Sequence, residues 1–154
     1  MLHYNEDKPF IGYKLIPSNR STMVLLKLET YIKHSRIIAS LAIIISITAW
    51  AVELAGVVYV CPYCRTQRTV IGILGILLIL PIASHWITKY IALVVGFFGA
   101  VVAANQHFMG WKKISAGTFS FHEKIAMDPF LLSGLALTGI IGLILLILQQ
   151  TKPE

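Results

Sequence analysis

Two cysteines, Cys61 and Cys64, stand two residues apart and are the only cysteines in the chain. Cysteines at this spacing can form a small, reducible disulfide, and the species that attacks in thiol–disulfide exchange is the thiolate. If a helix begins near Cys64, its free N–H groups and its dipole favour an anion at that sulfur. Arg65 and Arg68 follow and add positive charge. We therefore predict a redox-active dithiol and a pKa of Cys64 below its ordinary value.

Metal binding is the main alternative use of such a pair. Half of a zinc site has the same spacing, but tetrahedral zinc needs four ligands, and only His107, His122 and a few acids remain to complete it. Copper(I) held by the two cysteines and Met109 is also conceivable, because soft sulfur ligands select that ion. An inert structural dithiol is the third alternative. We favour redox chemistry and assign no metal ligand.

The composition indicates that the dithiol belongs to a membrane protein. The chain is 56% hydrophobic and only 13% charged, whereas soluble domains carry about 25% charged residues. Four apolar stretches have roughly the 20 residues that a spanning helix needs, namely residues 37–59, 69–87, 90–108 and 129–148. We predict an all-α membrane protein, a bundle of four transmembrane helices.

Three regions follow from these spans. Residues 1–36 form a polar leader, residues 37–148 the transmembrane domain and residues 149–154 a short tail. From Ser21 onward, apolar residues recur with helical spacing at positions such as Leu28 and Tyr31. This pattern is typical of an amphipathic helix lying in the membrane interface. A solvated helix, or an extension of the first span, is the alternative.

Basic residues around the spans predict the orientation. With the N-terminus inside, the cytoplasmic side holds six leader cations plus Lys89 and Lys152, eight in total, and the outer side holds five. Cytoplasmic loops carry the excess of Lys and Arg. We therefore interpret the net charge of +6 as a topology signal and not as a nucleic-acid surface. The dithiol then faces the periplasm of a bacterial inner membrane, where disulfides persist, and both termini are cytoplasmic.

Other features between the spans carry weaker expectations. Glu53 lies roughly two helical turns before Cys61, where an acid is either a proton acceptor for the dithiol or a protonated or hydrogen-bonded packing residue. Pro81 falls inside the second predicted span and is expected to kink it. Residues 109–128 form the predicted outer loop, amphipathic enough to lie on the membrane beside the dithiol.

With a membrane helix before it and a helix after it, the pattern Cys-x-x-Cys-x-x-Gln-Arg, read at Cys61, Cys64, Gln67 and Arg68, resembles the DsbB family. These are four-helix, quinone-dependent membrane proteins that reoxidise a periplasmic thiol oxidase of the thioredoxin fold. The resemblance covers roughly residues 37–148. It implies a thiol:quinone oxidoreductase that uses ubiquinone or menaquinone and serves a DsbA-like partner.

The resemblance also implies roles for individual residues. Cys61 and Cys64 would form the catalytic disulfide, with Cys64 nearest the quinone. Arg68 would help to bind the quinone, and Gln67 beside it is included in the predicted site. Gln106 resembles a glutamine often found at the outer end of the third helix in the family, and His107 is a weaker candidate for the quinone pocket.

One departure from the family pattern matters. DsbB proteins usually carry a second cysteine pair in the second outer loop, and residues 109–128 contain no cysteine. Either a partner dithiol attacks Cys61–Cys64 directly, or another subunit supplies the missing pair. The remaining alternative is a non-catalytic accessory or assembly subunit of a membrane complex, handling copper or the thiols of a partner.

Overall fold

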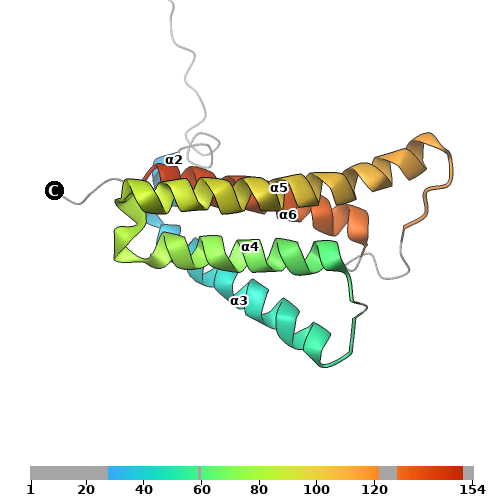
Figure 1. Cartoon of the computed structure of the whole chain (residues 1–154), viewed down its shortest axis with the longest axis horizontal. Coiled ribbons are helices and arrows are strands. Elements are labelled where there is room, and N and C mark those ends of the chain that lie inside the picture. The colour runs from blue at the N-terminus through green and yellow to red at the C-terminus, as the bar shows by residue number, and fades with distance from the viewer. Residues whose placement is uncertain (1–27, 59, 122–127, 151–154) are drawn as a thin grey trace, which may run out of the picture.

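The computed structural model describes residues 28–58, 60–121 and 128–150, and helices account for most of them. Figure 1 shows their order along the chain. The elements are α2 (Leu28–Lys33), α3 (Ser35–Leu54), α4 (Pro62–Ile79), the 3-10 helix η1 (Pro81–Ser84), α5 (Trp86–Ser115) and α6 (Pro129–Leu148). No strand occurs in these described ranges. The predicted all-α class is confirmed.

Three of the described helices, α3, α5 and α6, are long and apolar enough to cross a membrane. Large apolar side chains such as Phe97 and Phe98 are mostly exposed, as expected for a surface that lipid covers. The chain is therefore a multi-pass membrane protein. Helix α4 has 18 residues but opens with polar turns that contain Arg65, Gln67 and Arg68, so its role as a fourth span stays a prediction.

The start of α6 agrees with the sequence, because the capping residues are explicit there. Asp128 is the N-cap, and its Oδ1 accepts hydrogen bonds from the backbone N–H groups of Phe130 (2.9 Å) and Leu131 (3.3 Å). Pro129 occupies the first helical position, where its missing N–H costs nothing. The predicted span 129–148 is confirmed as a helix with the same bounds.

The predicted extent of the second span, 69–87, is wrong. Helix α4 ends at Ile79, and Leu80 is extended with φ −67° and ψ 142°. A residue before proline is excluded from the helical region by the proline ring, so Pro81 ends the helix instead of kinking it. After η1, the side chain of His85 accepts a hydrogen bond from Ile87 N (3.3 Å) and caps the start of α5.

The third span is longer than predicted, and the outer loop is correspondingly shorter. Helix α5 continues past Phe108 to Ser115, so residues 109–115 are helical and not loop. Gly110 lets α5 approach Phe130 closely, since a Cβ at Gly110 would lie 2.3 Å from the Phe130 ring. Gly117, with φ +68°, follows the helix end. Residues 122–127 of the predicted loop lie outside the described residues.

The first predicted span also differs at its outer end. Helix α3 stops at Leu54, and Gly56 adopts φ +71°, a left-handed conformation that glycine tolerates. An irregular segment then leads to Cys61. Of the amphipathic helix predicted from Ser21, residues 21–27 lie outside the described residues, and α2 covers the remainder from Leu28 to Lys33.

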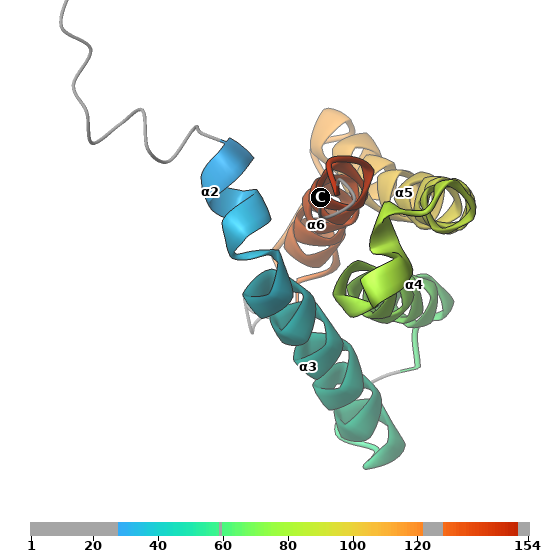
Figure 2. The same ribbon diagram turned by 90° about the vertical axis from the view of Figure 1, so that its left-hand side faces the viewer.

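Four helices form two packed pairs. Helix α3 runs along α4, α5 runs along α6, and α4 also contacts both α5 and α6. Figure 2 shows α3 diverging from α5 and α6, and among the described helices α3 has no contact with α6 comparable to its contact with α4. The buried core between α4, α5 and α6 includes Leu74, Ala92 and Ile140. This arrangement leaves a gap in the packing between α3 and α6.

We expect close helix contact at Gly99 to be sensitive to one added methyl group. A Cβ at Gly99 would lie 2.6 Å from Cγ1 of Val70 on α4, whereas a Cβ at Gly139 meets nothing within 4 Å. Gly99→Ala should lower the free energy of unfolding by about 1–3 kcal/mol through overpacking, and Gly139→Ala should not lower it. Thermal unfolding in detergent measures both, and equal melting temperatures would contradict this packing.

Candidate functional site

The dithiol forms the N-terminus of α4. Cys61 is the N-cap residue, and its Sγ accepts a hydrogen bond from the backbone N–H of Cys64 at 3.3 Å. Pro62 takes the first helical position, which its fixed φ favours. Both cysteines are thiols in the structure and are partly buried. The expectation that a helix begins at this motif is confirmed.

The predicted lowering of the Cys64 pKa is wrong. Burial removes water from the thiolate and, together with the neighbouring Cys61, raises the pKa of Cys64 from 9.0 to about 11. A hydrogen bond from Gln106 acts in the opposite direction. The two arginines, which the sequence places close by, pair with a carboxylate instead of with the sulfur. The Cys64 thiol is therefore held mainly in its protonated form near neutral pH.

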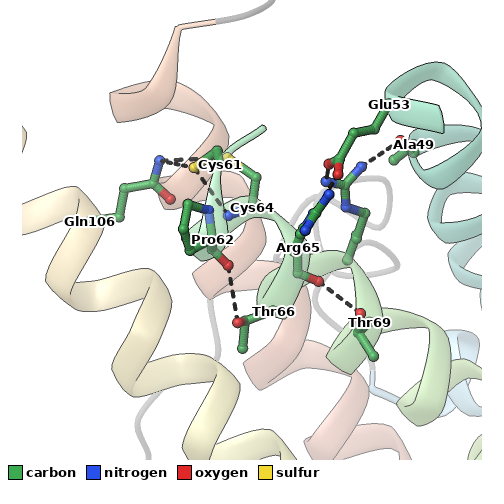
Figure 3. A network of polar contacts seen from close by, with 10 residues as sticks. Ala49, Glu53, Cys61, Pro62, Cys64, Arg65, Thr66, Thr69 and Gln106 are labelled. Atoms are coloured by element: carbon green, nitrogen blue, oxygen red, sulfur yellow. Dashed lines mark hydrogen bonds and ion pairs between the residues drawn. The ribbon is translucent and has the colours of Figure 1, made fainter. Parts of the chain in front are cut away.

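Two glutamine side chains connect α4 and α5 beside the sulfurs. Gln67 Nε2 donates to Gln106 Oε1 at 2.8 Å. Gln106 Nε2 lies 3.8 Å from Cys64 Sγ and 4.0 Å from Cys61 Sγ, within donor range for sulfur (Figure 3). The structure thus brings Gln67 and Gln106 together with the dithiol, although 39 residues separate the two glutamines in the chain.

Glu53, at the end of α3, is the centre of a charged cluster. Its carboxylate accepts from Arg65 Nε and pairs with a terminal nitrogen of Arg68, whose other terminal nitrogen donates to Ala49 O at 2.5 Å. The Glu53 side chain is 1% exposed and that of Arg68 9%, against 45% for Arg65. The Trp50 ring lies 4.8 Å from the Arg68 guanidinium carbon.

In this cluster Glu53 is ion-paired, which is closer to the predicted packing residue than to the predicted proton acceptor. The carboxylate is engaged by two guanidinium groups, and Figure 3 shows it apart from the sulfurs. Glu53 is therefore a buried ion-paired residue that joins α3 to α4, and no contact places it as a proton acceptor for the dithiol. One carboxylate against two guanidinium groups leaves the cluster with a net positive charge.

His107 faces a different part of the molecule from Gln106. Its Nδ1 lies 3.0 Å from Phe130 O, and its ring stacks on Phe130 with centroids 4.2 Å apart. Ser133 Oγ is 3.4 Å from the same nitrogen. Consecutive helical residues point about 100° apart, so Gln106 reaches the sulfurs while His107 packs on α6. The structure does not bring His107 to the dithiol.

A groove of about 1590 Å³ extends from the dithiol along the gap between α3, α4 and α6. Four polar residues of the predicted site line it near the start of α4, namely Cys61, Cys64, Gln67 and Arg68. Most of the remaining wall is apolar, with residues such as Ile45 on α3 and Leu143 on α6. The groove can therefore accommodate a molecule that is polar at one end and apolar along the rest.

Sequence reasoning missed the wall that α6 contributes. Its lining residues include Leu132, Leu135, Ala136, Gly139 and Leu143. These positions recur at i, i+3, i+4, i+7 and i+11, which places them on one face of a helix. That periodicity was a usable signal, but an apolar helix offers the same residues for lipid, for packing and for a ligand. The sequence alone gives no reason to choose among them.

The described residues contain no group of three or more His, Cys, Asp or Glu side chains that could hold a metal ion. No family model, curated protein or solved structure matches this chain. A function must therefore be inferred from the geometry and the chemistry of the site.

Removal of the Glu53 carboxylate should destabilise the protein far more than removal of Arg65. Glu53→Ala leaves the buried Arg68 without its counter-ion, a change that costs about 3–5 kcal/mol in buried pairs. Arg65→Ala removes a half-exposed partner while Arg68 still neutralises Glu53, so its cost should be about 0–1 kcal/mol. Thermal unfolding in detergent compares the two, and similar losses would contradict the assigned burial.

The raised pKa of Cys64 predicts slow alkylation near neutral pH. With a pKa of about 11 instead of 9.0, the thiolate fraction at pH 8 is about 100-fold smaller than for an ordinary thiol. Only the thiolate reacts. Iodoacetamide should modify Cys64 about 100-fold more slowly than a free thiol of ordinary pKa, and the rate should rise with pH up to about 11. Mass spectrometry measures the alkylation rate of Cys64 at each pH. A rate that reaches a plateau below pH 9 would contradict this prediction.

Proposed function

We propose that this chain is a DsbB-like membrane thiol:quinone oxidoreductase. In this function Cys61–Cys64 takes electrons from the dithiol of a periplasmic thioredoxin-fold protein and delivers them to a membrane quinone. The observation that carries the proposal is the position of the dithiol at the polar end of a long apolar groove. Few other ligands combine a compact polar head with a long hydrocarbon chain and can also accept electrons from thiols.

The groove residues fit a quinone such as ubiquinone or menaquinone. Bound there, a quinone would supply the capacity to accept two electrons and two protons. Cys64 and Gln67 line the polar end, and the apolar wall of α3 and α6 suits an isoprenoid tail. Both terminal nitrogens of Arg68 already have partners in Glu53 and Ala49. Its Nε is buried and has no hydrogen-bond partner among the described residues. Arg68 would therefore contribute its positive charge at the groove, because its terminal nitrogens are already engaged.

The exchange with the partner needs only this cysteine pair. A thiolate of the partner would attack Cys61 in the oxidised pair, forming a mixed disulfide and releasing Cys64 as the leaving sulfur. The partner's second thiolate would then displace Cys61 and leave a disulfide in the partner. Two electrons and two protons thereby reach Cys61 and Cys64. Cys61 precedes the helix and Tyr63 beside it is exposed, which favours attack from outside the bundle.

The proposed setting is a bacterial inner membrane, with α4 as the fourth span and both termini cytoplasmic. The apolar part of α4, residues 69–79, follows its polar first turns. At the opposite end of the bundle, Trp86 and Tyr90 are mostly exposed, as aromatic residues at a membrane interface are. The excess of basic residues on the proposed inner side supports the same orientation.

A second function is favoured by one specific observation, the single cysteine pair. Without a second pair in the chain, the two-step relay usual in the DsbB family cannot run within it. An accessory or assembly subunit that handles copper or the thiols of a partner would need only Cys61 and Cys64. In that role the redox state of the pair would be independent of quinone.

Cys64→Ser should abolish quinone reduction. Purified protein given a reduced thioredoxin-like partner should reduce ubiquinone or menaquinone. The ultraviolet absorbance of the quinone measures this reduction. The variant should fall to the rate without protein, because it cannot re-form the Cys61–Cys64 disulfide. Thr69→Val is the matched control, since Thr69 is exposed and its hydroxyl donates only to Arg65 O.

Undiminished activity in Cys64→Ser would refute the proposed reaction. Alkylation gel shifts in cells give a second readout, in which the pair should be mostly oxidised during respiration and become reduced when quinone is depleted. A pair that ignores quinone status would instead support the accessory role.

A further inference from the structure

Gln106 presents one defined end of its amide to the dithiol. An amide side chain has a donor end and an acceptor end. Gln67 Nε2 donates to Gln106 Oε1 at 2.8 Å, and Gln106 Nε2 points at the sulfurs of Cys64 and Cys61, 3.8 and 4.0 Å away. Figure 3 shows the Gln106 amide reaching both sulfurs from α5.

We propose that Gln106 is the hydrogen-bond donor that stabilises the thiolate form of this cysteine pair, and that Gln67 is a positioning residue that holds the Gln106 amide in the donating orientation. This inference deepens the proposed function, because the thiolate is the form that exchanges with disulfides and gives up electrons. It assigns Gln106 to the sulfurs and not to the quinone.

The surroundings leave Gln106 as the available donor. Arg65 and Arg68, the nearest cations in sequence, are bound to Glu53. The backbone N–H of Cys64 donates to Cys61 Sγ, so it serves one sulfur only. Among the described residues, Gln106 is the side chain with a donor in reach of both sulfurs. A thiolate on either cysteine would therefore meet the same amide nitrogen.

Gln67 is suited to fix that amide because its own side chain is almost fully buried. It is 4% exposed and belongs to the same helix as Cys64. If Gln106 turned its amide over, its carbonyl oxygen would face the sulfurs and its nitrogen would face the Nε2 donor of Gln67. The carbonyl oxygen would then repel a thiolate, and the two amide nitrogens, which are both donors, would repel each other. The hydrogen bond between the glutamines therefore favours the donating orientation.

The test measures thiol ionisation in the absence of quinone and partner. Reduced full-length protein in detergent is alkylated with iodoacetamide between pH 7 and 11, and tandem mass spectrometry reports the rate at each sulfur. Gln106→Leu should raise the pKa of Cys64 by about one unit, which makes alkylation about tenfold slower at a fixed pH. Gln106→Asn, whose shorter amide withdraws from the sulfurs, should shift the pKa in the same direction and preserves polarity.

A double-mutant cycle tests the positioning role of Gln67. Gln67→Leu should raise the pKa of Cys64 by less than Gln106→Leu, and the double variant should match Gln106→Leu alone, because Gln67 acts through Gln106. Thr66→Val is the control: it removes a hydroxyl from the same helical turn that donates only to Pro62 O, and should leave the pKa unchanged.

An unchanged Cys64 pKa in both Gln106 variants would overturn the role of Gln106. Additive shifts in the double variant would overturn the positioning role of Gln67. These results are separable from the proposed function: a pair that shows the expected Gln106 dependence but never reduces quinone would refute the oxidoreductase and leave this inference standing.

Discussion

Glu53 is a buried carboxylate that neither lipid nor a dry protein interior would solvate, and its pairing with two arginines determines how the dithiol end of the bundle is built. Since Arg65 and Arg68 come from α4 and Glu53 from α3, satisfying the carboxylate holds α3 against the first turns of α4. A buried ion pair is costly unless every member finds partners. The Ala49 carbonyl and the Trp50 ring add contacts to Arg68, whose buried Nε has no hydrogen-bond partner in the part of the chain that the structure describes.

The same pairing determines the electrostatics of the dithiol. Because the guanidinium groups turn toward Glu53, they do not compensate the charge of a Cys64 thiolate directly, and burial dominates its pKa. A protonated resting thiol is protected from oxidation and unwanted alkylation. The neutral amide of Gln106 is left as the group that moderates this protection. Structure and reactivity at this site are therefore linked through residues that touch no sulfur.

Local signals in the sequence predicted part of the fold. The start of α4 followed from the cysteine motif, and the span 129–148 followed from its apolar length, with Asp128 and Pro129 capping its start in the structure. Hydropathy could not locate the ends of the second and third spans, because apolar residues continue through Pro81 and polar residues begin before α5 ends. There, proline geometry and the contact of Gly110 with Phe130 override composition.

The candidate site shows the same division. Cys61 and Cys64 were found from type and spacing, and Gln67 and Gln106 from the family resemblance. All four gather in space. The ionic partner of Arg68 could not be predicted, because Cys64 lies four residues and Glu53 fifteen residues before it in the sequence. Only the three-dimensional arrangement of α3 shows that Glu53 takes both arginines. His107 was grouped with Gln106 by adjacency, and helical rotation separates them.

The divergence of α3 from α6 determines how reactants can reach the dithiol. A lipid-soluble reactant could enter the groove laterally, between these two helices. A soluble protein would instead approach the end of the bundle, where Val60 and Tyr63 are exposed. Two reactants of opposite solubility would then have separate approaches to one sulfur pair. In the proposed function, the two reactants would then not compete for one binding site, and neither would have to dissociate before the other could bind.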